Sequence, residues 1–467
     1  MAEMGRPLGA TEENWTKATA MGTGIQVIGL AMKRRIESIQ ITEAAKAVMQ
    51  QNSLLRSKIV SSKGKLVYEI ASTPAPVVEV FSWPASIRKS TATLILPGDN
   101  GELSSALHHV VTEELNTPFP NAAQKFTGPT DVFLIHVYAD SSESRTIVIL
   151  RLVSGAIDRP SAVVVTQSFL SSLNALVNGK QPQLPEAPGK NELLPTLEEL
   201  IPKGKKKGFF QKGLDTVGYV ASVGKYALYP FHSGFSGAKI SDYKSDILSY
   251  TLGKEGTSAL TAACEREKTT ISAALTAAFL KGAASAEELK SKKQHFGFTS
   301  VVDLRPHFEP ALPSSALGNY SGGVSQDEQV KAEADFWELA RSVSSGTLKE
   351  VEKGRHFSEI AVMNMLFSQV LQRPSLTAKS SLRTGLMSFF EKTLDARWKD
   401  TQNLELAGTL GPFASMHGAG PCFCIGEGLL EGPEFAFSVV YPTPVYSRDQ
   451  MEGLANTSLA ILNAATK

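Results

Sequence analysis

Cysteine is scarce in this 467-residue sequence, and the three that occur, Cys264, Cys422 and Cys424, form an odd set. Such a set does not build a disulfide framework, so a reducing compartment is expected. Cys422 and Cys424 alternate along a predicted strand and therefore share one of its faces. Core packing is the preferred interpretation of this pair because no second cysteine pair is present, with nucleophile and metal ligand as the alternatives.

Long apolar runs and an excess of charge of one sign are also missing. No stretch of eighteen apolar residues occurs, so no membrane span is predicted. The start, "MAEMGRPLGATEENW", does not resemble a signal peptide, and the end, "LNAATK", matches no lipidation or retrieval signal. The formal net charge of +1 gives no global reason to expect a nucleic-acid partner. We expect a cytoplasmic monomer that binds a small molecule.

The length predicts two or three domains, and strand-like runs alternate with helical ones along most of the chain. Between 178 and about 235 the texture changes to Pro/Gly-rich and then basic sequence, which predicts a crossover. The predicted elements are strands at 24–33, 66–71, 77–83, 130–139, 145–154 and 295–306, helices at 42–59, 103–115, 161–177, 258–282 and 328–348, and a strand, turn and helix over 435–462.

This alternation predicts an α/β protein with mixed sheets and helices packed outside them. We divide the chain into an N-terminal lobe (1–185), a crossover linker (186–245) and a C-terminal lobe (246–467). A cleft between two such lobes is a usual place for a ligand.

Four segments carry a family resemblance by their order and spacing: "RLVSGAIDRPSA" (151–162), "VVDLRPHFEPALPSSALGNYSGG" (301–323), "LAGTLGPFASMHGAGP" (406–421) and "VVYPTPVYSRDQM" (439–451). Together they resemble the CoA-dependent acyltransferase superfamily, which includes chloramphenicol acetyltransferase, the plant BAHD enzymes and the condensation domains of peptide synthetases. Plant condensation-domain-like proteins and mycobacterial polyketide-associated acyltransferases are the most similar groups. The resemblance implies two chloramphenicol-acetyltransferase-like lobes with an active-site tunnel between them, and an acyl-CoA co-substrate with no covalently bound cofactor.

The family motif, HHxxxD, has two histidines, three variable residues and an aspartate, and it is degenerate here. Asp158 matches the aspartate, which holds the loop through an arginine, but Ser154 stands where the catalytic base would be and Val153 matches the first histidine. A serine hydroxyl cannot replace imidazole, which titrates near 6.5, as a base. General base catalysis contributes about 10²–10⁴-fold, so ordinary acyl transfer is expected to be slower by that factor unless another group takes over.

Other site residues are implied by the resemblance. Arg305 in "VDLRP" is the preferred structural partner of Asp158, with Arg159 as its rival. Thr409 is either an oxyanion donor or an ordinary strand threonine. His417 is either a replacement base or a turn histidine bonded to backbone.

Substrate contacts are predicted at Gly155, Asn319 and Tyr320. Ser154 either holds a substrate polar group or packs a tight turn, and the small Gly155 beside it leaves room. His108 and His109 in "HHVVTEE" are interpreted as helix-surface or groove residues, with weak support for zinc. The run "KGKKKGFFQKG" is either a solvated linker or a contact for the phosphates of CoA or acidic lipid.

Three functions follow from these residues. The preferred one is acyl transfer in specialised metabolism, from a CoA thioester to a hydroxyl or amine acceptor, without the usual histidine base. The second is different chemistry in the same tunnel, such as a lyase or cyclisation reaction, which needs a shaped, dry pocket. The third is a non-catalytic binding protein.

Overall fold

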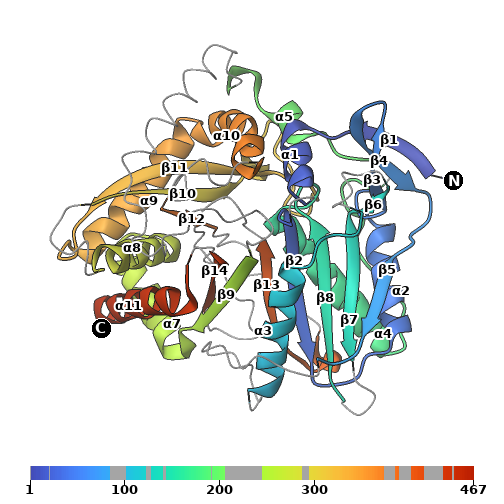
Figure 1. Ribbon diagram of the computed structural model, residues 1–467, viewed down its shortest axis with the longest axis horizontal. Helices are drawn as coiled ribbons and strands as arrows, with labels where there is room; N and C mark the ends of the chain where they lie inside the picture. Colours follow the sequence, from blue (N-terminus) through green and yellow to red (C-terminus); the bar gives the residue numbers. More distant parts are fainter. Residues whose placement is uncertain are drawn as a thin grey trace.

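The computed structural model describes residues 2–19, 22–84, 101–121, 128–139, 144–190, 192–205, 244–286, 294–372, 384–388, 401–414, 435–443 and 446–467. They form a mixed α/β fold (Figure 1). His417, Cys422 and Cys424 lie outside the described residues.

A five-stranded mixed sheet lies within the first apolar core. Its strand order is β13 (Leu406–Ala414), β2 (Ile25–Met32), β8 (Thr146–Val153), β7 (Phe133–Ala139) and β5 (Val77–Phe81). Neighbouring strands are antiparallel except β5 and β7, which are parallel. Both β2 and β8 are buried over their whole length, which agrees with their continuous apolar sequences.

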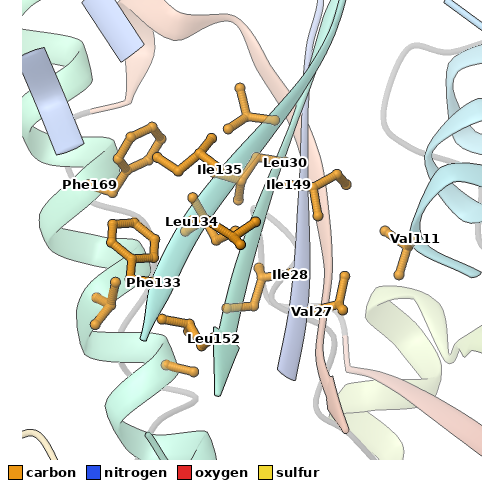
Figure 2. Packing of buried hydrophobic residues seen from close by; sticks show 14 of the residues in the cluster. Val27, Ile28, Leu30, Val111, Phe133, Leu134, Ile135, Ile149, Leu152 and Phe169 are labelled. Atoms are coloured by element: carbon orange, nitrogen blue, oxygen red, sulfur yellow. The ribbon is translucent and has the colours of Figure 1, made fainter. Parts of the chain in front are cut away.

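Helices cover both faces of this sheet. Figure 2 shows Phe169 of α4 (Arg159–Val177) packing on one face and Val111 of α3 (Glu102–Leu115) facing the other. Gly29 makes the approach of α3 possible, because a Cβ at this position would lie 2.4 Å from a Val111 methyl group. The helix α2 (Ser38–Gln50) packs beside α4.

The helix α4 is long and apolar enough to cross a membrane by length and composition alone. Its apolar residues, including Phe169, Leu170 and Leu173, are instead buried within the first core. A core helix of this kind passes the same composition test, so α4 is a core element of the fold.

A smaller sheet lies at the start of the chain, in the order β1 (Ala2–Pro7), β4 (Lys65–Ala71), β3 (Ser57–Ser62) and β6 (Thr130–Asp131). The helix α1 (Ala10–Thr19) follows β1 and leads into β2.

A second large apolar cluster is formed by residues between 248 and 462. Its strands are the antiparallel pair β9 (Lys244–Thr251) and β14 (Ala436–Thr443), and a sheet in the order β11 (Ser321–Val330), β10 (Gln294–Asp303), β12 (Gly385–Met387). Its helices are α7 (Gly253–Arg266), α8 (Ile271–Ala284), α9 (Phe336–Glu352) and α11 (Arg448–Thr466). The helix α10 (Arg355–Gln372) packs on β11 and contributes Phe357 and Ile360 to a separate small cluster. Short helical turns are α5 (Leu197–Leu200), η2 (Lys203–Lys205), η4 (Arg305–His307) and η7 (Gln402–Leu404).

The helix α3 connects the first sheet to β9 through side-chain hydrogen bonds. His108 Nε2 lies 3.0 Å from the Ile247 carbonyl oxygen. Asn116 donates to the Ser245 carbonyl at 2.8 Å and accepts from the Ser245 amide at 2.7 Å. A surface position for His108, one of the two predicted alternatives, is therefore wrong, because its imidazole is buried against β9.

Glu114, on the same helix, is a buried carboxylate at the centre of a charge network. It lies 2.7 Å from His136 Nδ1 and 3.2 Å from Arg151 Nε, and it accepts from Tyr138 at 2.5 Å. Burial alone would raise the pKa of Glu114, but the His136 and Arg151 interactions outweigh it and lower this pKa. Within the described ranges, no group of three or more His, Cys, Asp or Glu side chains could hold a metal ion.

Two predicted helices differ from the structure at their ends. The predicted helix 42–59 ends at Gln50, and residues 57–62 form β3 instead. The predicted helix 328–348 begins at Phe336, after Asp335 caps it by accepting from the Glu338 amide. The division at 185 and 245 stays a prediction.

Candidate active site

The segment Ser154–Asp158 joins the end of β8 to the start of α4. Asp158 is the N-cap of α4, and its side chain accepts from the Ser161 amide at 2.9 Å. Pro160 occupies the first turn, where a missing amide hydrogen costs nothing. The pattern Asp-Arg-Pro-Ser therefore fixes the start of the helix locally.

Arg305 forms a bidentate ion pair with Asp158. Its Nη1 and Nη2 donate to the two carboxylate oxygens at 3.0 and 2.9 Å. The Asp158 carboxylate also accepts from the Tyr320 amide at 2.9 Å and from the Ser321 hydroxyl at 3.1 Å. Arg159, the rival partner, donates instead to the Ser388 carbonyl at 2.5 Å. This is the charge-assisted, two-point geometry that arginine favours for carboxylates.

The remaining donors of Arg305 are also used. Nε donates to the Ala316 carbonyl at 2.9 Å, Nη1 to Asp303 at 2.9 Å and Nη2 to the Ser161 hydroxyl at 2.7 Å. Arg305 and Asp158 are almost completely buried. Burial would raise the pKa of Asp158, but the Arg305 charge and the hydrogen bonds outweigh it and hold this pKa below its ordinary value. Both groups therefore stay charged.

The backbone of Ser154 forms two hydrogen bonds, whereas its hydroxyl forms none with the described residues. Its amide donates to the Gly24 carbonyl at 2.9 Å, and Asn319 Nδ2 donates to the Ser154 carbonyl at 2.7 Å. The side chain is buried, and Oγ has no hydrogen-bond partner among the described residues. A buried hydroxyl without a partner costs about 1–3 kcal/mol, so a bound water or ligand group there would be stabilising.

Gly155 was predicted, from its small size, to leave room for a substrate. The structure shows that α1 fills this space instead. A Cβ there would lie 2.1 Å from Thr16 Oγ1 and 2.5 Å from the Glu12 carbonyl oxygen. The space beside Gly155 is therefore filled by α1, and the glycine serves the close packing of this helix on the loop.

Asn319 and Tyr320, both predicted to bind substrate, make contacts within the chain. The Asn319 amide nitrogen fixes the Ser154 carbonyl, as described above. The Tyr320 hydroxyl donates to the Pro195 carbonyl at 2.9 Å, and the Arg305 guanidinium lies 5.1 Å from the centre of the Tyr320 ring. These contacts support the loop and the ion pair.

Thr409 lies too far along the sheet to serve as an oxyanion donor at Ser154. It pairs with Leu30 on β2, whereas Val153 pairs with Ile25. Leu30 and Ile25 are five residues apart along β2, about 17 Å at the usual strand rise. A donor must lie about 3 Å from the reacting oxygen, so this prediction was wrong for a reaction at Ser154.

Ser161 is a part of the site that sequence reasoning missed. Its hydroxyl accepts from Arg305 and from the Gly318 amide at 3.1 Å, and it donates to the Gly318 carbonyl at 3.0 Å. A serine three residues after a helix-capping aspartate was a visible signal, but its hydroxyl contacts depend on residues more than 140 positions away.

Removal of the buried carboxylate is expected to destabilise the fold. Asp158→Ala leaves the Arg305 charge unpaired, and loss of one member of a buried pair costs about 3–5 kcal/mol. Asp303→Ala is the matched control, because Asp303 also bonds Arg305 but is 28% exposed, and we expect a much smaller loss. Urea unfolding measures both variants, and equal losses would contradict a special role for Asp158.

The same pair predicts a pH dependence of stability. The folded-state pKa of Asp158 is lowered, so its contribution is present above the unfolded pKa, about 3.9, and disappears as pH falls through the folded pKa. The difference in unfolding free energy between the wild type and Asp158→Asn should therefore shrink below about pH 4. Urea titrations at a series of pH values test this, and a constant difference down to acid would be inconsistent with it.

Comparisons with known proteins agree with this architecture. A family model described as "Phthiocerol/phthiodiolone dimycocerosyl transferase C-terminus" matches residues 246–379. No curated protein matches the chain at a significant level.

Several solved structures share the whole fold. Polyketide synthase associated protein 5 from Mycobacterium tuberculosis is 13% identical, with a TM-score of 0.66 over 100% of this chain and 99% of that one. The first condensation domain of the CDA synthetase is 11% identical, with a TM-score of 0.62 over 99% and 96%. The starter condensation domain of rhizomide synthetase RzmA, solved with C8-CoA and Leu-SNAC, is 10% identical, with a TM-score of 0.61 over 99% and 94%. The chain therefore has a CoA-acyltransferase-like fold similar to that of condensation domains.

Proposed function

We propose that this protein is an acyltransferase of specialised metabolism. It transfers an acyl group from a CoA thioester to a hydroxyl or amine acceptor, in a tunnel between two lobes, with no imidazole at position 154. In this reaction the acceptor atom bonds to the thioester carbonyl carbon, the C–S bond breaks, and the acceptor proton passes to the leaving thiolate.

The observation that carries the proposal is that the backbone of Ser154 is held in place by hydrogen bonds while its hydroxyl makes none in the described part of the chain. Its backbone is fixed by Gly24 and Asn319, and Asp158 and Arg305 hold the loop behind it. Its hydroxyl is buried without a partner in the described part of the chain. A hydroxyl both donates and accepts, so it can hold a polar group of the substrate or a water in the tunnel.

The proton must be accepted by a group other than Ser154, and His417 is the residue we propose. It lies outside the described residues, so its support comes from the strand that precedes it in sequence. That strand, β13, ends at Ala414, opposite Gln26 of β2. Gln26 is next to Ile25, which pairs with Val153 just before Ser154. Ala414, the last residue of β13, therefore lies toward the Ser154 end of the sheet. It precedes His417 by three residues in the sequence.

A second candidate is a binding protein without catalysis. Three residues that would contact substrate make contacts within the chain instead: Gly155 against α1, Asn319 with Ser154, and Tyr320 with Pro195. The Ser154 hydroxyl would then bond to a ligand that is not turned over. This candidate predicts acyl-CoA binding with no release of free CoA.

Restoring histidine at position 154 separates the two candidates. If the tunnel still presents an acyl-CoA to this loop, Ser154→His should raise acyl transfer about 10²-fold or more, the usual contribution of a general base. Ser154→Gln is the control of similar bulk without a base, and it should give no gain. Free CoA thiol release with a panel of alcohols and amines measures the rates. Absence of turnover in all three proteins, with acyl-CoA still bound, would favour the binding protein.

The relocated base is tested by substitution and by pH. His417→Ala should lower turnover about 10²-fold. The wild-type rate should rise with pH through a pKa near 6.5, because a base works in its deprotonated form, whichever acceptor is used. Unchanged turnover in His417→Ala, or a profile that moves with the pKa of the acceptor amine, would exclude His417 as the base.

A further inference from the structure

Three basic side chains from separate segments lie together beside η4. They are Lys205 at the end of η2, His307 at the end of η4, and His356 in the first turn of α10. The rings of His307 and His356 have centroids 4.7 Å apart at an interplanar angle of 48°. The turn η4 begins with Arg305, so this group lies two residues along the chain from the partner of Asp158.

His356 is the buried member of the group. Its side chain is 3% exposed, and neither ring nitrogen makes a hydrogen bond of good geometry among the described residues, although the Val351 carbonyl interacts with the ring. Phe357 packs beside it with ring centroids 4.3 Å apart. A neutral imidazole offers one donor and one acceptor, and leaving both unused in a buried position is costly. This imidazole therefore favours a ligand that brings hydrogen-bonding atoms to it.

Lys205 brings a positive charge to the same place. Its Nζ lies 3.4 Å from where a Cβ on Gly354 would stand, at the residue directly before α10. Among the described residues, it forms no ion pair. The start of the 18-residue helix α10 adds a partial positive charge at this point, and the end of α9 at Glu352 partly offsets it.

Two basic groups act on the His356 ring. Burial, and then the charges of His307 and Lys205, lower the pKa of His356 to about 4, with only the Val351 carbonyl opposing them. The nearby carboxylate of Glu350 already accepts from Lys353 at 2.5 Å and from Arg355 at 3.1 Å. A metal ion would meet the Lys205 charge here, whereas an anion would be attracted by it.

We propose that Lys205, His307 and His356 bind a phosphate group. The phosphate oxygens accept from the Lys205 ammonium and from the imidazole nitrogens, and the start of α10 favours their charge. The phosphate comes either from free inorganic phosphate or from a phosphate ester such as those of CoA. This inference does not depend on acyl transfer, because it concerns binding alone.

Binding of inorganic phosphate, CoA and dephospho-CoA to the whole chain is measured by calorimetry. Lys205→Met and His356→Phe should each weaken phosphate binding about tenfold or more, the effect of losing one charge-assisted or buried hydrogen bond. Lys205 is exposed, so its replacement should leave the fold intact, and the phenylalanine at 356 keeps an aromatic ring beside Phe357. Lys203→Met, in the same turn η2, is the matched control and should bind like the wild type.

The imidazole gives a second readout. NMR titration of the histidine rings should show that phosphate raises the pKa of His356, because a bound anion favours the protonated ring. A loss of affinity for CoA but not for dephospho-CoA in Lys205→Met would identify the 3′-phosphate of CoA as the source. A loss of affinity for inorganic phosphate in Lys205→Met as large as the loss for CoA would support a site for the free anion. The proposal is overturned by no measurable binding of any of the three, by binding unaffected in both variants, or by zinc binding in preference to phosphate.

Discussion

The ion pair between Asp158 and Arg305 is the constraint on which the site depends. Its two residues are 147 positions apart, one at the start of α4 and the other just after β10. A carboxylate buried this deeply has to be paired and hydrogen-bonded, and Arg305 with the Tyr320 amide and the Ser161 amide meets that requirement. The same contacts fix the direction in which β8 leaves the sheet, and hence where Ser154 stands.

This support does not depend on the side chain at position 154. The hydrogen bonds to Ser154 go to its backbone, from its amide to Gly24 and from Asn319 to its carbonyl. A change of the side chain at position 154 therefore alters the chemistry of the loop without removing a contact that holds it. The Asp158–Arg305 ion pair therefore supports the fold in the same way for an enzyme and for a binding protein.

The parts that could be predicted from the sequence are those set by local patterns or by strong pairing rules. The apolar runs of β2 and β8 gave their positions, and Asp158 followed by Pro160 marks a helix start. Arg305 was identifiable because a buried carboxylate needs a bidentate partner, and an arginine follows the apolar part of β10. In contrast, β11 carries several glycine and polar residues, so its sequence lacks the alternation of a typical strand, and a helix was predicted from 328.

The predictions for Thr409 and Gly155 were wrong because these roles depend on the register and packing of segments far apart in sequence. Thr409 has a suitable hydroxyl, but a strand side chain reaches a site only if its ladder position allows it, and β13 pairs it with Leu30. Gly155 has only a hydrogen as its side chain, but whether this leaves a cavity depends on how α1 packs against it. The sequence of α1 has no apolar pattern that predicts this packing, because its buried face includes Thr11, Glu12 and Thr16. Composition can suggest which groups take part in chemistry, whereas their distance from Ser154 is decided by contacts between segments far apart in sequence.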